Sequence, residues 1–136
     1  MKTWHVILVM SFALALVVLP AYAAFADKNA SVPKYDKATE AVFKGVIDEV
    51  KDRECPISGG MGAHLMLKLS DGQLLEVHLA TSKFVKEYEL VFSKGDEIQV
   101  TGAKIKFEDK DAILAREIKK GNDVFVFRDK EGKPVW

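Results

Sequence analysis

The sequence contains a single cysteine, Cys55, among its 136 residues. One cysteine cannot form a disulfide within the chain, and it cannot form a Cys-x-x-Cys pair. Covalent attachment of a c-type haem, which needs the pattern Cys-x-x-Cys-His, is therefore excluded. In an exported protein, a lone Cys55 stays free, pairs with another molecule or binds a ligand.

Several catalytic motifs are also missing. The chain has no Walker loop, no Gly-x-Ser-x-Gly and no His-Glu-x-x-His. The glycine-rich stretch SGGMG at residues 58–62 precedes an expected strand, so it lacks the helix N-terminus that would hold a phosphate. We interpret this stretch as a loop, and we expect a protein that is not an enzyme.

The chain carries no excess of charge of either sign. Twenty Lys and Arg residues match twenty Asp and Glu residues, and Lys2 is the only one of them that precedes Asp27. Nucleic-acid binding and attachment to anionic lipid both rely on clustered basic residues. The composition therefore argues against a nucleic-acid partner, and we expect membrane contact only through the N-terminal segment if it is not cleaved.

The one long hydrophobic run lies near the N-terminus. VILVMSFALALVVLP follows Lys2, and two small-residue cleavage sites come after it, AYA ending at Ala23 and AFA ending at Ala26. This order is typical of a secretory signal peptide, so we predict that residues 1–26 are removed and that the protein is periplasmic or secreted. The alternative is a retained membrane anchor, because the run approaches the ~20 residues that span a bilayer.

The rest of the chain is expected to form a leader and one domain. Residues 27–40 are polar and aperiodic, which predicts a flexible leader, and the domain occupies residues 41–136. Helical spacing of apolar residues predicts one short helix over residues 82–92. β-branched and alternating segments predict six strands, with a bulge at Gly102 in the fourth. The expected strands are residues 41–52, 63–70, 74–80, 97–107, 111–118 and 123–129.

This order of elements is that of an OB-fold, an all-β five-stranded Greek-key barrel with a helix between strands three and four, plus one extra C-terminal strand. FKGVIDEV at residues 43–50 and SKGDEIQVTGAKIKFEDKDAILAREIKKGN at residues 93–122 resemble small exported bacterial OB-fold proteins of unassigned function. The resemblance covers about residues 41–120. It implies a binding protein of the bacterial envelope.

The second and third strands form a hairpin whose register follows from their alternation. Leucines 65, 67 and 69 must share a face with residues 75, 77 and 79, so the numbers of paired residues must sum to an even value. A loop at residues 70–72, with Gly72 left-handed, meets this condition and pairs His64 with His78. A loop at residues 71–73 also meets it, but places His64 opposite Ala80.

The face opposite the leucines is the candidate site. OB barrels bind glycans, oligonucleotides or peptides on the face of these two strands, so we predict a binding face for an envelope protein, a glycan or a small ligand. This face carries His64, Met66, Lys68, Glu76 and His78. The alternative interpretation is that its histidines have no function and simply belong to a solvated strand face.

A metal site is the second functional hypothesis. Directly opposed residues have Cβ atoms ~4.5–5.5 Å apart, so His64 and His78 could share one ion, with Cys55 and Met61 or Met66 completing the site. Imidazole, thiolate and thioether ligands together suit copper. Haem iron is a further possibility, although the periplasmic haem-chaperone OB proteins use a C-terminal His-x-x-x-Tyr, and the tail RDKEGKPVW has no histidine.

Overall fold

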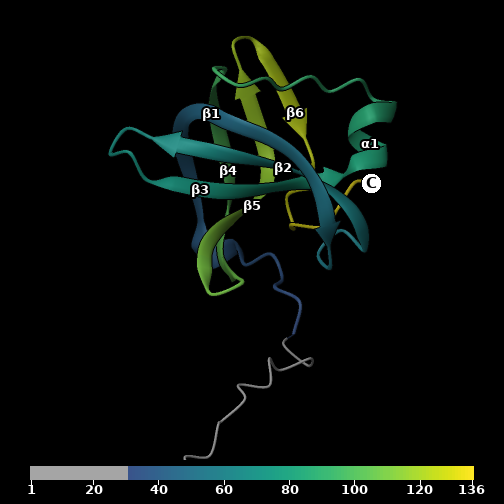
Figure 1. Cartoon of the computed structure of the whole chain (residues 1–136). Helices are drawn as coiled ribbons and strands as arrows, with labels where there is room; N and C mark the ends of the chain where they lie inside the picture. The colour runs from purple at the N-terminus through teal and green to yellow at the C-terminus, as the bar shows by residue number, and fades with distance from the viewer. Residues whose placement is uncertain (1–30) are drawn as a thin grey trace, which may run out of the picture. The chain divides into compact units, whose positions relative to one another are not determined.

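The computed structural model describes residues 31–136 and consists largely of β-strands (Figure 1). A 3₁₀ helix, η1, precedes the first strand, and one short α-helix, α1, lies between the third and fourth strands. The elements are η1 (Lys37–Thr39), β1 (Glu40–Cys55), β2 (Gly60–Leu69), β3 (Leu74–Thr81), α1 (Ser82–Glu87), β4 (Glu97–Phe107), β5 (Lys110–Lys120) and β6 (Asp123–Val126). The predicted signal peptide, residues 1–26, lies outside the described residues.

The strands form one sheet in the order β3-β2-β1-β4-β5-β6, with antiparallel neighbours. β3 also pairs with β5 in parallel, which closes five strands into a ring and leaves β6 as an extra strand on β5. The predicted all-β class, the helix between strands three and four, and the extra C-terminal strand are thereby confirmed. The bulge predicted in β4 lies between Thr101 and Gly102.

Two element boundaries differ from those predicted. β2 starts at Gly60, so the predicted loop at residues 58–62 is shorter and its last glycines belong to the strand. The helix ends at Glu87 rather than at residue 92. Glu89 adopts a left-handed conformation (φ 52°), and the Leu90 N–H donates to the Val85 carbonyl. This is a Schellman ending, which stops a helix whatever its apolar spacing.

The structure buries apolar side chains on both faces of its central strands. The main core contains Leu65, Leu67 and Val77 of the hairpin together with Ile113 of β5. A second cluster lies on the opposite face of β5, because Ala112 and Leu114 alternate with main-core residues. Its members are Cys55, Ile105, Phe107, Ala112 and Leu114, with Tyr35 and Ile57 packed against them. This second cluster packs around the candidate site.

The described part of the predicted leader contacts the domain. The Tyr35 hydroxyl and the Arg116 guanidinium both donate to the Glu40 carboxylate, and η1 begins two residues after Tyr35. At the other end of the chain, the C-terminus lies beside α1 (Figure 1), where the Trp136 and Phe84 ring centroids are 6.4 Å apart. Within residues 31–136, no helix is long and apolar enough to cross a membrane.

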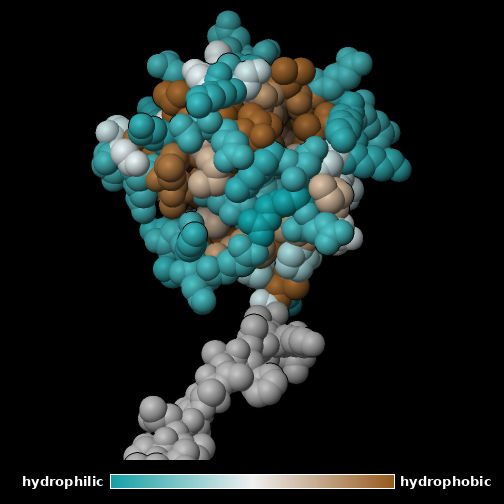
Figure 2. Space-filling model, viewed as in Figure 1, coloured by the Kyte–Doolittle hydropathy of each residue, from teal (hydrophilic) through white to brown (hydrophobic). Residues whose placement is uncertain are grey.

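The surface is mostly polar. Figure 2 shows one face of the domain covered largely by hydrophilic side chains, with separate hydrophobic patches between them. The most exposed large apolar side chains include Val42 and Val124, on β1 and β6.

Candidate metal centre

The β2–β3 hairpin has the register that pairs the two histidines. His64 lies opposite His78, and Met66 lies opposite Glu76. The Leu69 N–H donates to Gln73 across the predicted three-residue loop, and Gly72 is left-handed with φ +84°. The alternative register, which sets His64 opposite Ala80, is wrong. The centroids of the two imidazole rings lie 4.2 Å apart.

The third member of the cluster comes from the end of β1. Cys55 is the last residue of β1 and pairs with Gly60, the first residue of β2. Its Sγ atom lies 3.5 Å from Nδ1 of His78. Cys55, His64 and His78 each offer a ligand atom, and these three atoms all lie within 4.8 Å of one another.

All three side chains are buried, so the interpretation of a solvated strand face is wrong. Cys55 and His78 are 3% exposed and His64 is 1% exposed. The cause is the second cluster, because the Phe107 ring packs edge-on against His78 at 4.7 Å and Leu114 pairs with His78 in the parallel ladder. Alternation placed the histidines on the face opposite the leucines, but residues of other strands bury that face here.

A carboxylate fixes the orientation of one imidazole. Nδ1 of His64 lies 2.6 Å from Oε1 of Glu76, and Arg53 Nη1 donates to the same oxygen at 3.2 Å. Arg53 also pairs with Glu108 and lies over the Phe107 ring. With Nδ1–H donated to Glu76, Nε2 of His64 carries the free lone pair. A carboxylate that holds a histidine in this way is a regular partner of metal-binding histidines.

The environment keeps both imidazoles neutral. Burial, with a smaller contribution from the neighbouring His64, lowers the pKa of His78 to about 3. Burial also lowers the pKa of His64, although its hydrogen bond to Glu76 acts in the opposite direction. The neutral imidazole is the form that binds metal ions, so neither ring has to lose a proton at neutral pH.

The cluster borders a hollow of ≈ 10 Å³, which is the space of about one water molecule. Gly62 leaves space beside His64 and Cys55, because it has no side chain. A Cβ atom at this position would lie 2.8 Å from Nε2 of His64 and 3.2 Å from Cβ of Cys55. The hollow is lined by Cys55, Ile57, Ser58, His64, His78, Leu79, Ala80, Arg128 and Trp136. The hollow is therefore small, and it has room for a single small species.

Among the other predicted site residues, Glu76 contacts the cluster through His64, whereas the two methionines and Lys68 are not part of it. Met61 is 49% exposed and lines a different hollow beside α1. Met66 is half-buried opposite Glu76, and Lys68 is exposed further along β2. The predicted binding face is thus divided into a buried end with the histidines and an exposed end near the loop.

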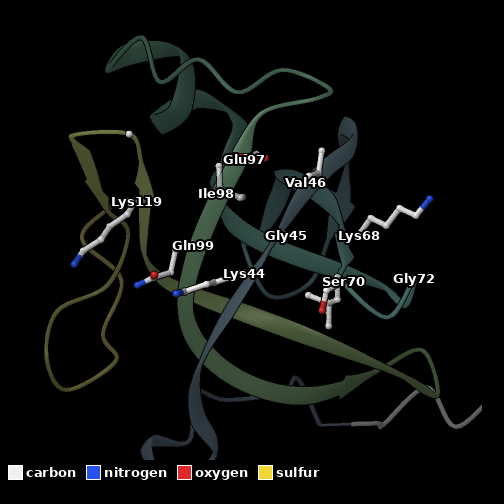
Figure 3. A pocket seen from close by; sticks show the side chains of 12 residues that line it. Lys44, Gly45, Val46, Lys68, Ser70, Gly72, Glu97, Ile98, Gln99 and Lys119 are labelled. Atoms are coloured by element: carbon white, nitrogen blue, oxygen red, sulfur yellow. The ribbon is translucent and has the colours of Figure 1, made fainter.

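A much larger hollow lies at that exposed end. Its volume is ≈ 680 Å³, and it shares no residue with the metal-ligand cluster. Figure 3 shows that Lys44, Gln99 and Lys119 extend toward the same side, from neighbouring positions on β1, β4 and β5. The apolar residues Val46, Leu69 and Ile98 also line it. The candidate metal site lies at the small hollow, because within residues 31–136 the ligand atoms of Cys55, His64 and His78 form the one group of three close enough to hold a single ion.

Four residues of the site were missed by sequence reasoning. Arg53 supports Glu76, Gly62 gives His64 room, and Arg128 and Trp136 line the hollow. Arg53, Arg128 and Trp136 have no local signal, because they meet the histidines only through the folding of distant segments. Gly62 lies two residues before His64 on β2, but nothing in the strand pattern marks it as part of the site.

The sequence matches the model of the MamS/MamX magnetosome protein family over residues 39–125. The match contains the whole cluster of Cys55, His64 and His78, and it ends before Arg128 and Trp136. No curated protein matches the chain.

Proposed function

We propose that this chain, which belongs to the MamS/MamX magnetosome protein family, binds one thiophilic metal ion of the copper or zinc type. The observation that supports this proposal is the buried cluster of Cys55, His64 and His78, whose ligand atoms lie within 4.8 Å of one another. The family name links its members to the magnetosome, and we propose that this chain is a magnetosome-associated protein.

The spacing of the cluster suits one ion. Metal–sulfur bonds of ~2.3 Å and metal–nitrogen bonds of ~2.0 Å put a sulfur and a nitrogen of a tetrahedral site about 3.5 Å apart. The observed separation of Cys55 Sγ and His78 Nδ1 is 3.5 Å. In the proposed site, His64 binds through Nε2, His78 binds through one ring nitrogen, and Cys55 binds as the thiolate and releases its proton.

The ligand set and the closed hollow narrow the choice of ion. Thiolate and imidazole prefer copper and zinc, whereas ions such as Mg²⁺ and Mn²⁺ prefer oxygen ligands. A hollow of ≈ 10 Å³ has no room for the further ligands of an octahedral ion. Met61, one of the two methionines expected to complete the site, is exposed and lines another hollow, so we propose a site with three protein ligands, Cys55, His64 and His78.

We also propose that the protein is not an enzyme. Cys55 and His78 resemble a nucleophile and its base in their separation, but such a pair must reach a substrate. Both residues are buried, and the adjoining hollow holds about one water molecule. A His78 pKa of about 3 is also too low for an efficient general base near neutral pH.

The metal proposal is tested by titrating the purified full chain with Cu(I), Zn(II) and Fe(II) under anaerobic conditions. We expect about one copper or zinc ion per chain in the wild type. The double variant His64→Ala plus His78→Ala should lose this stoichiometry. Met61→Leu is the matched control, because Met61 is a possible ligand type outside the cluster, and it should bind like the wild type. Equal stoichiometry in all three proteins would contradict the proposal.

Export remains part of the proposal. Residues 1–26 have the composition of a signal peptide, and the mature protein would then occupy the periplasm or the exterior. Mass spectrometry of protein recovered from the producing cells should give a chain that begins after Ala23 or Ala26. Recovery of an intact N-terminus in the membrane fraction would favour the retained anchor.

A second candidate function is the binding of a small organic anion, and the hollow of ≈ 680 Å³ supports it. Its size lies within the range of ligand sites, and it combines an apolar floor with three lysines and one glutamate. Lys44, Lys68 and Lys119 have no carboxylate partner among residues 31–136. We propose a carboxylic acid with a hydrocarbon tail as the ligand. Its carboxylate would pair with the lysines, and its tail would contact the apolar residues that line the hollow.

This second function is tested with a fluorescent fatty acid and its displacement by dodecanoate. Binding should weaken in Lys44→Ala plus Lys119→Ala and persist in Lys94→Ala, a lysine that does not line the hollow. Equal binding in the two variants, or no binding by the wild type, would exclude this ligand class. Metal binding should be the same in both variants.

A further inference from the structure

Two arginines lie near the metal-ligand cluster, and only one of them has acidic partners. Arg53 is paired with Glu76 and Glu108. Arg128 is 5% exposed and, among residues 31–136, has no carboxylate within salt-bridge distance. A buried cation without a counter-charge is costly, so its position calls for an explanation.

The contacts of Arg128 hold the side chain without neutralising it. Nη1 donates to the Gly132 carbonyl at 3.3 Å, and the guanidinium lies over the rings of Trp136 at 4.9 Å and Tyr35 at 5.8 Å. Nε is buried and has no hydrogen-bond partner among the described residues. Carbonyl and aromatic contacts are dipole and quadrupole interactions, so the full positive charge remains.

The charge of Arg128 acts on the metal-ligand cluster. Arg128 lines the same small hollow as Cys55, His64 and His78. The nearest carboxylate, Glu76, is hydrogen-bonded to His64 and paired with Arg53. An ion bound by the cluster would therefore lie beside a buried positive charge that has no carboxylate partner among residues 31–136.

We infer that Arg128 makes the site selective for monovalent copper, Cu(I), over divalent ions. This inference rests on the proposed metal binding. A Cys55 thiolate and two neutral imidazoles carry one negative charge, so Cu(I) gives a neutral centre beside Arg128. Zn(II) or Cu(II) gives a positive centre, and the Coulomb repulsion of a unit charge for a dication is twice that for a monocation. The repulsion is strong because the groups are buried and water screens them poorly.

The coordination number favours the same ion. The cluster offers three protein ligands of the soft and borderline kinds that Cu(I) accepts. Zinc sites usually have four ligands in a tetrahedron, and the ≈ 10 Å³ hollow could supply at most one water as the fourth. Arg128 and Trp136 close that hollow from the C-terminal segment, which lies beyond the family match.

The test is the ratio of Cu(I) to Zn(II) dissociation constants, measured by competition with chromogenic chelators on the full chain. Arg128→Met removes the charge and keeps a long apolar side chain, and it should shift the ratio toward Zn(II) by on the order of tenfold. Lys130→Met is the matched control, because Lys130 is an exposed cation of the same C-terminal segment, and its ratio should equal that of the wild type.

Arg128→Lys separates charge from packing. It keeps the positive charge and loses the planar guanidinium that stacks on Trp136, so it should retain most of the preference for Cu(I). Circular dichroism of each variant checks that it is folded. An unchanged ratio in a folded Arg128→Met, or an equal shift in Arg128→Lys, would overturn the inference. If the wild type binds neither ion, the proposed function itself has failed.

Discussion

The two ends of the outer face of the β2–β3 hairpin, opposite the leucines, differ sharply in burial. His64, Met66 and Lys68 follow one another on the same face of β2, and Leu74, Glu76 and His78 do so on β3. At the end near Cys55 the histidines are 1% and 3% exposed, whereas at the loop end Leu74 is 48% exposed. From His64–His78 to Lys68–Leu74 the two strands pair in one unbroken register, and the register shifts only beyond His64. Along this stretch the ends differ in what covers them.

The covering comes from segments far away in the sequence. Phe107 of β4 and Leu114 of β5 pack on the histidine end, and Trp136 closes it from the C-terminus. Within residues 31–136 nothing equivalent covers Lys68, which is exposed and borders the hollow in Figure 3. One strand face thus supplies a buried polar site and an open surface, and the following predictions test this contrast.

The largest expected effect is on the free energy of unfolding. It concerns the leucine face of the hairpin, which packs into the main core. Leu65 and Leu67 are fully buried in the main core, and each replacement by Ala should lower the free energy of unfolding by about 2–5 kcal/mol. Leu74→Ala, at the exposed end of the outer face, should change it by less than about 0.5 kcal/mol. Urea denaturation measures all three, and a large loss in Leu74→Ala would show that the loop end is covered in solution.

An intermediate effect concerns the glycines at the start of β2. A Cβ atom on Gly62 would crowd Nε2 of His64, whereas a Cβ atom on Gly60 meets no atom within 4 Å. Gly62→Ala should therefore weaken metal binding by on the order of tenfold, about 1.4 kcal/mol, and Gly60→Ala should leave it unchanged. Competition titration with a chelator gives both values. Equal affinities in the two variants would mean that metal does not bind at this side of His64.

The smallest single effect is expected for His78→Leu, and its comparison with His64→Leu distinguishes a functional histidine from a structural one. His78 has a buried Nε2 without a partner among residues 31–136, so His78→Leu should leave the metal-free protein as stable as before or up to about 1 kcal/mol more stable. His64→Leu should destabilise it by about 1–3 kcal/mol, because Glu76 loses a buried partner. Similar losses in both variants, measured by thermal unfolding without metal, would indicate a structural role for His78.

Much of the fold was predictable because its signals are local. Strict alternation in residues 63–70 and 74–80 placed the leucines on one face, and parity together with Gly72 set the register that pairs His64 with His78. The end of the helix was not predictable from its apolar spacing, because that spacing continues to residue 92 while the backbone turns left-handed at Glu89. Cys55 was expected in the site because thiolates bind metal ions, but no feature of the strand pattern predicted that it would lie near the histidines.

The sequence by itself determined which residues share a face and which residues lie opposite each other, since both follow from the two-residue period of a strand and from one short loop. Only the tertiary structure decided what covers that face. Burial depends on β5 pairing in parallel with β3, on Phe107 returning over His78, and on Arg128 and Trp136 closing the hollow. These contacts join segments that are tens of residues apart, and no local pattern encodes them.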